Sequence, residues 1–264
     1  MAMSTSFGNA PAISPRLGRP AVLVLAAFGA VIAAAWIVTI LTSNDLMTLL
    51  GNEVAGAAPI ATLAYFSLTG VMMTAMMLPS ALPMVTLYQR FALADSSPRE
   101  GNVRSVLFTL SYLLVWAVFA AIVLVVVMVL GLMGGLSGWV VLVPGGILVA
   151  AGAYQFSSWK RYCLEGCQSP LGFFLTRWRT GRQGAVRLAL SHASFCLGCC
   201  WLLMLVVFVS GAMSLLWMGA VTGLVLVEKL WGNTLWVTRG IGLGTLSIGV
   251  GVSVLAFAAL FGLR

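Results

Sequence analysis

The sequence predicts an all-α fold, a polytopic transmembrane bundle of about seven helices with a cytoplasmic amino terminus. Composition is the first observation: of 264 residues, 61% are hydrophobic and 8% are charged, and the mean hydropathy is +1.07. A soluble domain does not reach such values. The second observation is the recurrence of apolar runs long enough to cross a bilayer, and the third is the placement of the basic residues between those runs.

The apolar runs define the predicted helices, each of about 18 residues or more. They lie at residues 21–41, 60–87, 106–130, 139–159, 186–210, 213–230 and 241–263. Only Gly211 and Ala212 separate the fifth run from the sixth, so a bundle of about six helices is the alternative. Residues 1–19 are polar and rich in Pro and Ser, which predicts a disordered cytoplasmic tail. Residues 20–264 are then a single transmembrane domain.

The basic residues set the orientation, because Lys and Arg are retained on the cytoplasmic side during insertion. With the amino terminus inside, every one of the 14 Lys and Arg residues except Arg264 falls on that side. The net charge of +8 therefore indicates topology and contact with anionic lipid. The lipid bilayer is the expected partner and the inner membrane the expected location. A nucleic-acid partner is not expected, because the charge is not gathered on a soluble domain.

The first run has no ionisable group and is interpreted as an anchor, followed by a short outer loop with Asp45 and Glu53. The second run contains two methionine stripes at helical spacing, Met72 with Met76 and Met73 with Met77. Pro79 and Pro83 follow them and predict a kink. Thioethers are soft ligands suited to Cu(I), but methionine is also a common filler of irregular packing, so both interpretations stay open.

The third run, which has only Ser111 and Tyr112 as polar residues near its cytoplasmic end, is interpreted as scaffold. The fourth run contains Gln155, a polar side chain that should bond a neighbour or line a polar cavity. Just beyond it come Cys163 and Cys167, one turn apart if that segment is helical. Unliganded cytosolic thiols are the alternative interpretation of this pair.

Residues 170–185 are basic and aromatic, which predicts an interfacial cytoplasmic segment lying on the inner leaflet, without chemistry. The sixth run has Gly219 and Gly223 at the spacing that lets two membrane helices approach closely. The seventh is also rich in glycine, so these helices are expected to offer packing surfaces, including a homo-oligomer contact.

The fifth run contains SHASFCLGCCW, residues 191–201, with the single histidine and three of the 5 cysteines. On a helix His192, Cys196 and Cys199 lie within roughly 60° of one another, with Cys200 beside them. Thiolates in hydrocarbon are costly unless a cation neutralises them. The number of cysteines is odd, and all of them are predicted to lie on the cytoplasmic side or within the membrane. A framework of structural disulfides is therefore improbable.

The rise of about 1.5 Å per residue gives the expected depths. Met72 and Met76 fall at the level of His192 and Cys196, with Cys163 and Cys167 just below and Cys199 and Cys200 deeper. This ladder fits either a single Cys/His/Met site or a relay of sites. Cysteine together with methionine favours Cu(I) over Zn(II). The alternative is that the histidine and the cysteines are core residues with one hydrogen bond each.

Four stretches, MMTAMMLPS, GAYQ followed by WKRYCLEGCQSPLGF, GAVRLALSHASFCLGCCWLLML and GAMSLLWMGAVTGLVLVEKL, resemble the bacterial predicted metal-binding integral membrane proteins, an uncharacterised family. The resemblance covers about residues 65–229, and implies metal binding without a tested metal or reaction. The chain departs from the family pattern at Ser158-Trp159 and at Ala193, and keeps every expected ligand. Gln155, Glu228 and Met204 are motif positions that would support the ligands from behind. Glu228 is also explained as a boundary residue, a partner for Lys229 or Arg239, or a base for His192.

Three functions follow from these features. The first is Cu(I) binding and delivery, either across the bilayer or to a membrane metalloenzyme, with a metallochaperone as a further expected partner. The second is thiol redox chemistry at Cys199 and Cys200 or at Cys163 and Cys167. The third is a structural subunit of a membrane complex. No constellation of Asp, Ser and Glu suggests hydrolysis, so catalysis is not the expectation.

Overall fold

The computed structural model describes residues 19–52, 59–130, 138–209, 214–231 and 235–262. Their helices, in order, are α1 (Arg19–Asn52), α2 (Pro59–Asp95), α3 (Pro98–Val129), the 3-10 helix η1 (Gly138–Leu142), α4 (Val143–Tyr154), α5 (Ser158–Gln168), α6 (Pro170–Arg177), α7 (Gly181–Val209), α8 (Leu215–Trp231) and α9 (Leu235–Leu260). These residues contain no strand, so the all-α prediction is confirmed. The predicted tail falls almost wholly on residues 1–18, and the boundary between the fifth and sixth runs on residues 210–213, both outside the described part.

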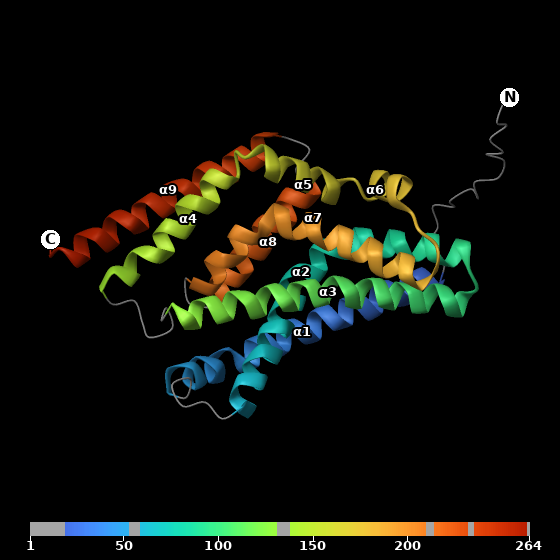
Figure 1. Cartoon of the computed structure of the whole chain (residues 1–264), viewed down its shortest axis with the longest axis horizontal. Helices are drawn as coiled ribbons and strands as arrows, with labels where there is room; N and C mark the ends of the chain where they lie inside the picture. Colours follow the sequence, from blue (N-terminus) through green and yellow to red (C-terminus); the bar gives the residue numbers. More distant parts are fainter. Residues whose placement is uncertain (1–18, 53–58, 131–137, 210–213, 232–234, 263–264) are drawn as a thin grey trace.

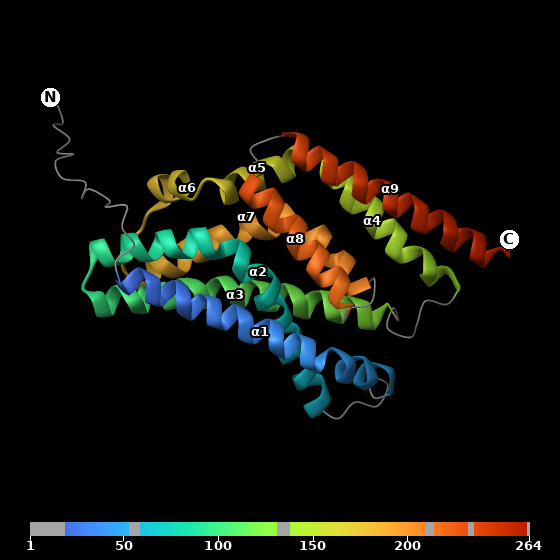
Figure 2. The same cartoon turned by 180° about the vertical axis from the view of Figure 1, so that it is seen from behind.

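Six of the seven apolar runs coincide with one helix each, the fourth is divided among η1, α4 and the start of α5, and several helices are longer than predicted. The outer loop expected around Asp45 is wrong in part, because α1 continues to Asn52. α3 begins at Pro98, where the ring presets the backbone angle of a first helical residue. Ser97 Oγ accepts from the Glu100 amide at 3.5 Å and caps this start. α2 keeps Pro79 and Pro83 inside it and bends along its length (Figures 1 and 2).

Four stretches are long and apolar enough to cross a membrane: Phe66–Asp95, Pro98–Val127, Gly181–Phe208 and Trp236–Leu260. A fifth follows if the bent pair Val140–Tyr154 and Ser158–Gln168 counts as one span. The apolar part of α1, Ala26–Thr42, and the 17-residue α8 are shorter. Within the described ranges the structure thus has four or five clear candidate spans, where the sequence predicts seven.

The fourth predicted helix is wrong as a single rod, since the chain bends by 72° between α4 and α5. The amides of Gln155, Phe156 and Ser157 bond three residues back, at 3.2, 3.1 and 3.0 Å, which closes the end of α4. Ser157 is extended, with φ −67° and ψ 139°, and its side chain accepts from the Trp159 amide. It therefore caps α5 and sends that helix in a new direction (Figure 1).

α4 and α9 lie side by side in both views (Figures 1 and 2), and the end of α4 contacts α7, where the Tyr154 hydroxyl donates to the Gly198 carbonyl at 2.6 Å. Glycine allows the contact between α4 and α9: a Cβ at Gly152 would lie 2.6 Å from the Leu246 amide nitrogen, and one at Gly249 would lie 2.6 Å from that of Val149. The predicted packing role of the last helix is confirmed at Gly249. Gly219 and Gly223, by contrast, have no such neighbour within 4 Å. The homo-oligomer contact stays a prediction.

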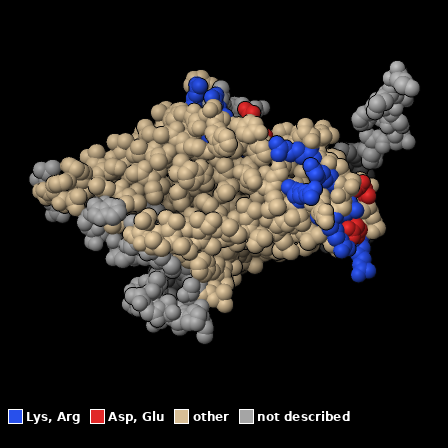
Figure 3. Space-filling model, in the orientation of Figure 1, with Lys and Arg blue, Asp and Glu red and all other residues tan. Residues whose placement is uncertain are grey.

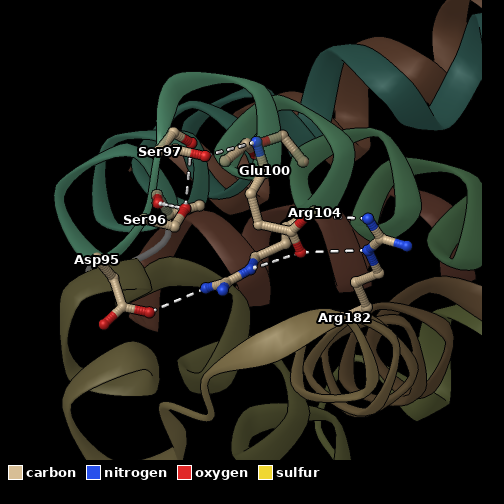
Figure 4. Close-up of polar contacts among 9 residues, drawn as sticks. Asp95, Ser96, Ser97, Glu100, Arg104 and Arg182 are labelled. Atoms are coloured by element: carbon tan, nitrogen blue, oxygen red, sulfur yellow. Dashed lines mark hydrogen bonds and ion pairs between the residues drawn. The ribbon is translucent and has the colours of Figure 1, made fainter.

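Ion pairs join the α2–α3 connection to the start of α7 (Figure 4). Arg104 contacts Asp95 at 2.9 Å and Glu100 at 3.3 Å, and Glu100 contacts Arg182 at 3.0 Å. The hydrogen bonds from Arg182 and then Arg104 lower the pKa of Glu100. Because Glu100 and Arg182 lie in the first turns of α3 and α7, these two helices begin at the same end of the molecule.

The predicted interfacial segment 170–185 is divided in the structure. α6 ends at Arg177, and α7 begins at Gly181, whose φ of +78° suits the residue without a side chain. Two aromatic residues of α6 face inward, because Phe173 and Phe174 are only 5% and 0% exposed. α6 therefore helps to close the core, which the expectation of a purely interfacial segment did not include.

Candidate metal centre

Cys196, midway along α7, is the point where four helices meet. Its Sγ lies 2.9 Å from Lys229 Nζ of α8 and 3.1 Å from the Tyr112 hydroxyl of α3. The same Nζ donates to Ser80 Oγ of α2 at 2.9 Å. Cys196 is 0% exposed, so this thiol has protein partners on several sides and no contact with solvent.

Three further thiols surround Cys196. Cys199 and Cys200 donate through Sγ to the Cys196 carbonyl at 3.1 and 3.0 Å, the back-bonding available three and four residues along a helix. Cys167 Sγ of α5 lies 4.0 Å from Cys199 Sγ. All 5 cysteines are free thiols.

α5 brings its cysteines to α7 because a glycine leaves room. A Cβ at Gly198 would lie 2.5 Å from Cys163 Sγ, so this sulfur occupies the space of the missing side chain. The helical spacing predicted for Cys163 and Cys167 is confirmed. Their predicted depth below His192 is wrong, because Cys167 lies beside Cys199. The bend after α4 folds α5 back along α7, which a continuous fourth helix did not allow.

A buried ion pair fixes α5 to α8. Lys160 Nζ lies 3.0 and 2.8 Å from the two Glu228 carboxylate oxygens, and the two side chains are 1% and 2% exposed. Gln168 Nε2 also donates to the Glu228 carbonyl at 2.8 Å. Glu228 thus pairs with Lys160, where the sequence suggested Lys229 or Arg239, and its roles as boundary residue or base for His192 stay predictions.

His192 lies one turn before Cys196 and is 2% exposed. Its ring is enclosed by those of Tyr112, Phe173 and Phe108, with centroid distances of 5.5, 5.8 and 6.4 Å. Neither imidazole nitrogen has a hydrogen-bond partner among the described residues. A buried polar group without a partner costs free energy, and the single hydrogen bond that the core interpretation of His192 requires is not found among the described residues.

Gln155 is the second buried polar side chain without a partner. It is 2% exposed, and neither its Oε1 nor its Nε2 has a hydrogen bond within the described part of the chain. The expected bond to a neighbour is therefore absent there. Its position at the bend between α4 and α5 places it at the base of the helix that carries Cys163 and Cys167.

The four predicted methionine ligands are fully enclosed. Met72 and Met73 are 1% exposed, Met76 and Met77 are 0% exposed, and Met204 of α7 is 0% exposed. They belong to the same buried cluster as Cys196, Cys199 and Cys200. Burial is what both interpretations of these methionines require, so it leaves packing and ligation open.

The described residues contain no group of three His, Cys, Asp or Glu side chains already arranged around a metal position. The contacts explain this, because Lys229 and Tyr112 engage the Cys196 thiol while Cys199 and Cys200 turn to a carbonyl. Binding would require these thiols to leave their present partners. The donors are therefore gathered without being preformed as a site.

Sequence reasoning missed three residues that contact Cys196 directly or through one atom: Ser80, Tyr112 and Lys229. The run that contains Tyr112 is interpreted from the sequence as scaffold, and Lys229 is considered there only as a partner for Glu228. Lys229 is in fact 8% exposed. A signal was present, since Glu228 and Lys229 end an otherwise apolar helix, and ionisable residues at such positions face the protein interior.

Comparison with known proteins adds a family. A family model for PpoB2, described as a copper chaperone, matches residues 66–252. No curated protein and no solved structure matches the chain. The matched stretch runs from α2 into α9 and includes the methionine stripes, every cysteine and His192. It covers well over half of the 264 residues. The chain therefore belongs to the PpoB2 copper chaperone family.

Proposed function

We propose that this chain is an integral membrane copper chaperone that binds Cu(I) between α2, α5 and α7 and passes it to a membrane metalloenzyme. The observation that supports this most is the gathering of three thiols, those of Cys167, Cys199 and Cys200, around the buried Cys196, beside a histidine whose nitrogens lack partners among the described residues. Copper is the cargo in this proposal, and Cys167, Cys196, Cys199, Cys200 and His192 are the donors that hold it.

The donor chemistry favours Cu(I). Thiolates and thioethers are soft ligands, and Met72 and Met76 add thioethers to the same interior. Cu(I) accepts low coordination numbers, so a small number of thiols can hold it and exchange it by adding one sulfur and releasing another. Cys163, which is 5% exposed, and the more exposed Cys167 lie on α5, the helix from which such an exchange would begin.

Charge also supports a thiolate site. A thiolate in an apolar interior needs a counter-charge, and Lys229 Nζ lies 2.9 Å from Cys196 Sγ. Cu(I) bound by two thiolates has one net negative charge, so a nearby ammonium stabilises the loaded site as well. Ser80 fixes this ammonium from α2.

A location in the inner membrane is part of the proposal. Four helices among the described residues are long and apolar enough to cross a bilayer, which supports this location. On the face shown in Figure 3, Lys and Arg gather over the end near α6 and over the region where α5 meets α9. The remaining surface on that face is almost free of charge, as a lipid-facing surface would be.

Copper content tests the proposal. The detergent-purified, reduced protein loaded with Cu(I) should retain copper, and Cys196→Ser and His192→Ala should each lose most of it. Ser194→Ala is the matched control, because Ser194 lies on the exposed side of the same turns of α7 and bonds only Leu190. Equal copper in wild type, Cys196→Ser and His192→Ala would refute the site.

A second pair of variants separates methionine ligation from packing. Met76→Leu removes one of the proposed thioether ligands, while Met84→Leu removes a buried thioether about two turns further along α2 that is not among the proposed ligands. If Met76 is a ligand, only the first variant should weaken Cu(I) binding. Equal affinity in both variants would assign the methionine stripe to packing alone.

Thiol redox chemistry is the second candidate, favoured by the 4.0 Å between Cys167 and Cys199 Sγ. This pair joins α5 to α7 and differs from the adjacent or single-helix pairs expected from the sequence. Alkylation of the metal-free protein before and after oxidation tests it. A disulfide between Cys167 and Cys199 that forms and is reduced reversibly in metal-free protein would favour redox function, whereas unchanged thiols would exclude it.

A further inference from the structure

A basic pocket lies beside the metal centre, at the end of the molecule where α6 joins α7. It has a volume of about 670 Å³ and is lined by Arg177, Arg179, Arg187, Thr176, Ser191 and Trp178, among others. None of the described residues that line it is acidic. Three guanidinium groups and two hydroxyls in one concavity are a chemistry suited to a phosphate or a comparable anion.

The arginines of this pocket are not neutralised by the protein. Arg177 donates to the hydroxyl of Ser191 at 2.8 Å, and stacks on the Phe195 and Phe173 rings at 4.8 and 5.4 Å. Neither Arg179 nor Arg187 forms an ion pair with a carboxylate of the described chain. Arg182, one turn from Arg187, differs because Glu100 already pairs with it at 3.0 Å. The pocket therefore presents uncompensated positive charge.

The connection that holds Arg179 is defined by glycines. A Cβ at Gly184 would lie 2.5 Å from the Arg179 carbonyl oxygen, so the chain packs closely on the first turn of α7. Gly181 takes a φ of +78° between them. Trp178 packs on Tyr88 and Phe91 of α2, at 5.6 and 5.4 Å between ring centroids. This edge of the pocket is thus a built feature of the fold.

An apolar groove adjoins the basic pocket and shares Arg187 with it. The groove has a volume of about 340 Å³ and runs between α3 and α7, with Leu107, Val186, Gln183 and Arg182 in its walls, and Arg182 is already paired with Glu100. Arg187, which has no carboxylate partner among the described residues, thus lies between a compartment suited to an anionic group and one suited to hydrocarbon. A free phosphate would use only the first compartment, whereas a phospholipid would use both.

We propose that an anionic phospholipid binds here, its phosphate held by Arg177, Arg179 and Arg187 and an acyl chain lying between α3 and α7. The inference rests on the membrane location of the proposed function, which places this end of the bundle at headgroup level. Tryptophan and arginine are the side chains expected there. Ser191 precedes His192, so the bound lipid contacts the turn of α7 that begins the metal centre.

Native mass spectrometry of the full-length protein in detergent tests this, with phosphatidylglycerol, phosphatidylcholine, glycerophosphate and inorganic phosphate as separate probes. Phosphatidylglycerol should bind in preference to phosphatidylcholine. In Arg179→Gln/Arg187→Gln its affinity should fall roughly 30-fold. Arg90→Gln/Arg99→Gln removes the same charge from exposed positions outside both compartments and should leave binding unchanged.

Three outcomes would overturn the inference. Equal binding of phosphatidylglycerol and phosphatidylcholine would exclude an anion site, and equal loss in both double variants would reduce it to overall charge. Competition by inorganic phosphate at the same concentration as lipid would make it a phosphate site without a lipid. Flotation with phosphatidylcholine vesicles distinguishes failure of the membrane location from failure of this site. Protein that does not float refutes the membrane location. Protein that floats but shows no preference for phosphatidylglycerol in mass spectrometry refutes only this site. Retained copper in the double variant shows that it is folded.

Discussion

Lys229 is the residue whose environment differs most from what its place in the sequence suggests. Its ammonium lies between Cys196 Sγ and Ser80 Oγ, at 2.9 Å from each. A buried cation is retained where it has a partner, because the cost of removing it from water is otherwise uncompensated. Lys229 is therefore tied to the state of the thiol beside it.

The first prediction concerns this cation. Lys229→Gln leaves a Cys196 thiolate without a counter-charge, so Cu(I) should bind about tenfold more weakly in competition with a Cu(I) chelator. Lys229→Arg keeps the charge and should recover most of the affinity. Wild-type affinity in the glutamine variant would show that the ammonium has a purely structural role.

The sequence predicts which residues of α7 lie near one another in the site, but it does not predict their contacts with other helices. Spacing on one helix identified His192 and Cys196 as neighbours, because helix geometry is independent of the fold. Contacts of Cys196 with Tyr112 and Lys229 depend on how α3 and α8 approach α7, which no local pattern states. The same limit explains why Glu228 was paired with the wrong basic residues.

At the scale of elements, the contact between α5 and α7 decides whether Cys163 and Cys167 reach the site. Gly198→Ala would place a methyl group 2.5 Å from Cys163 Sγ. Overpacking of this kind costs about 1–3 kcal/mol, so we expect a lower unfolding temperature in detergent and reduced copper content. Gly219→Ala, with no atom within 4 Å of its Cβ, is the control and should be neutral or mildly stabilising. Equal behaviour of the two variants would contradict the tight contact.

The Lys160–Glu228 pair makes a separate prediction about the attachment of α5. Glu228→Gln leaves a buried ammonium unpaired and should lower the free energy of unfolding by about 3–5 kcal/mol. The double variant Lys160→Met/Glu228→Leu removes both charges and should be more stable than the single variant. The free energy of unfolding lost in the double variant should be smaller than the sum of the losses in Lys160→Met and Glu228→Leu. A loss equal to that sum would mean that the two charges do not interact.

The ion pairs at the start of α3 and α7 predict a pH dependence. Because Arg182 and Arg104 lower the pKa of Glu100, its contribution to stability is present above the pKa of the unfolded chain. It is lost as the pH falls through the lower pKa of the folded state. The acid limb of stability against pH should therefore be shallower in Glu100→Gln than in wild type, measured by thermal unfolding. Parallel acid limbs in the two proteins would contradict this linkage.

The positions of the helices were predictable, and the break between α4 and α5 was not. Hydropathy alone locates apolar helices, and every predicted run except the fourth coincides with one helix. The break depends on Ser157, which caps a new helix, and on the ion pair between Lys160 and Glu228, which lie far apart in the sequence. Capping after Gln155 was visible in principle in the sequence QFSSWK, but an apolar average over the segment concealed it.

For the whole molecule, the ion pairs decide how the bent pair α4–α5 counts in the topology. Glu100 and Arg182 place the starts of α3 and α7 at one end, and Tyr112 meets Cys196 further along the same two helices. α3 and α7 therefore run in the same direction. α3 extends for about 48 Å at the usual rise per residue, so the chain must return before α7 begins. In the membrane location proposed above, the α4–α5 pair is therefore a crossing with a bend in it, and not a loop that leaves on the side it entered.

This reasoning predicts on which side of a membrane each connection lies. The α2–α3 connection and the α6–α7 connection should be on one side, and the end of α9 on the other, as Figure 1 suggests for the two ends of the bundle. Ser97→Cys, Thr180→Cys and Phe261→Cys place thiols at exposed positions in these three regions. An impermeant maleimide applied to right-side-out vesicles should label only the third, and applied to inside-out vesicles only the first two, after subtraction of wild-type labelling. Labelling of Ser97→Cys and Thr180→Cys from opposite sides would mean that α4–α5 does not cross, and would remove the parallel arrangement on which the metal centre depends.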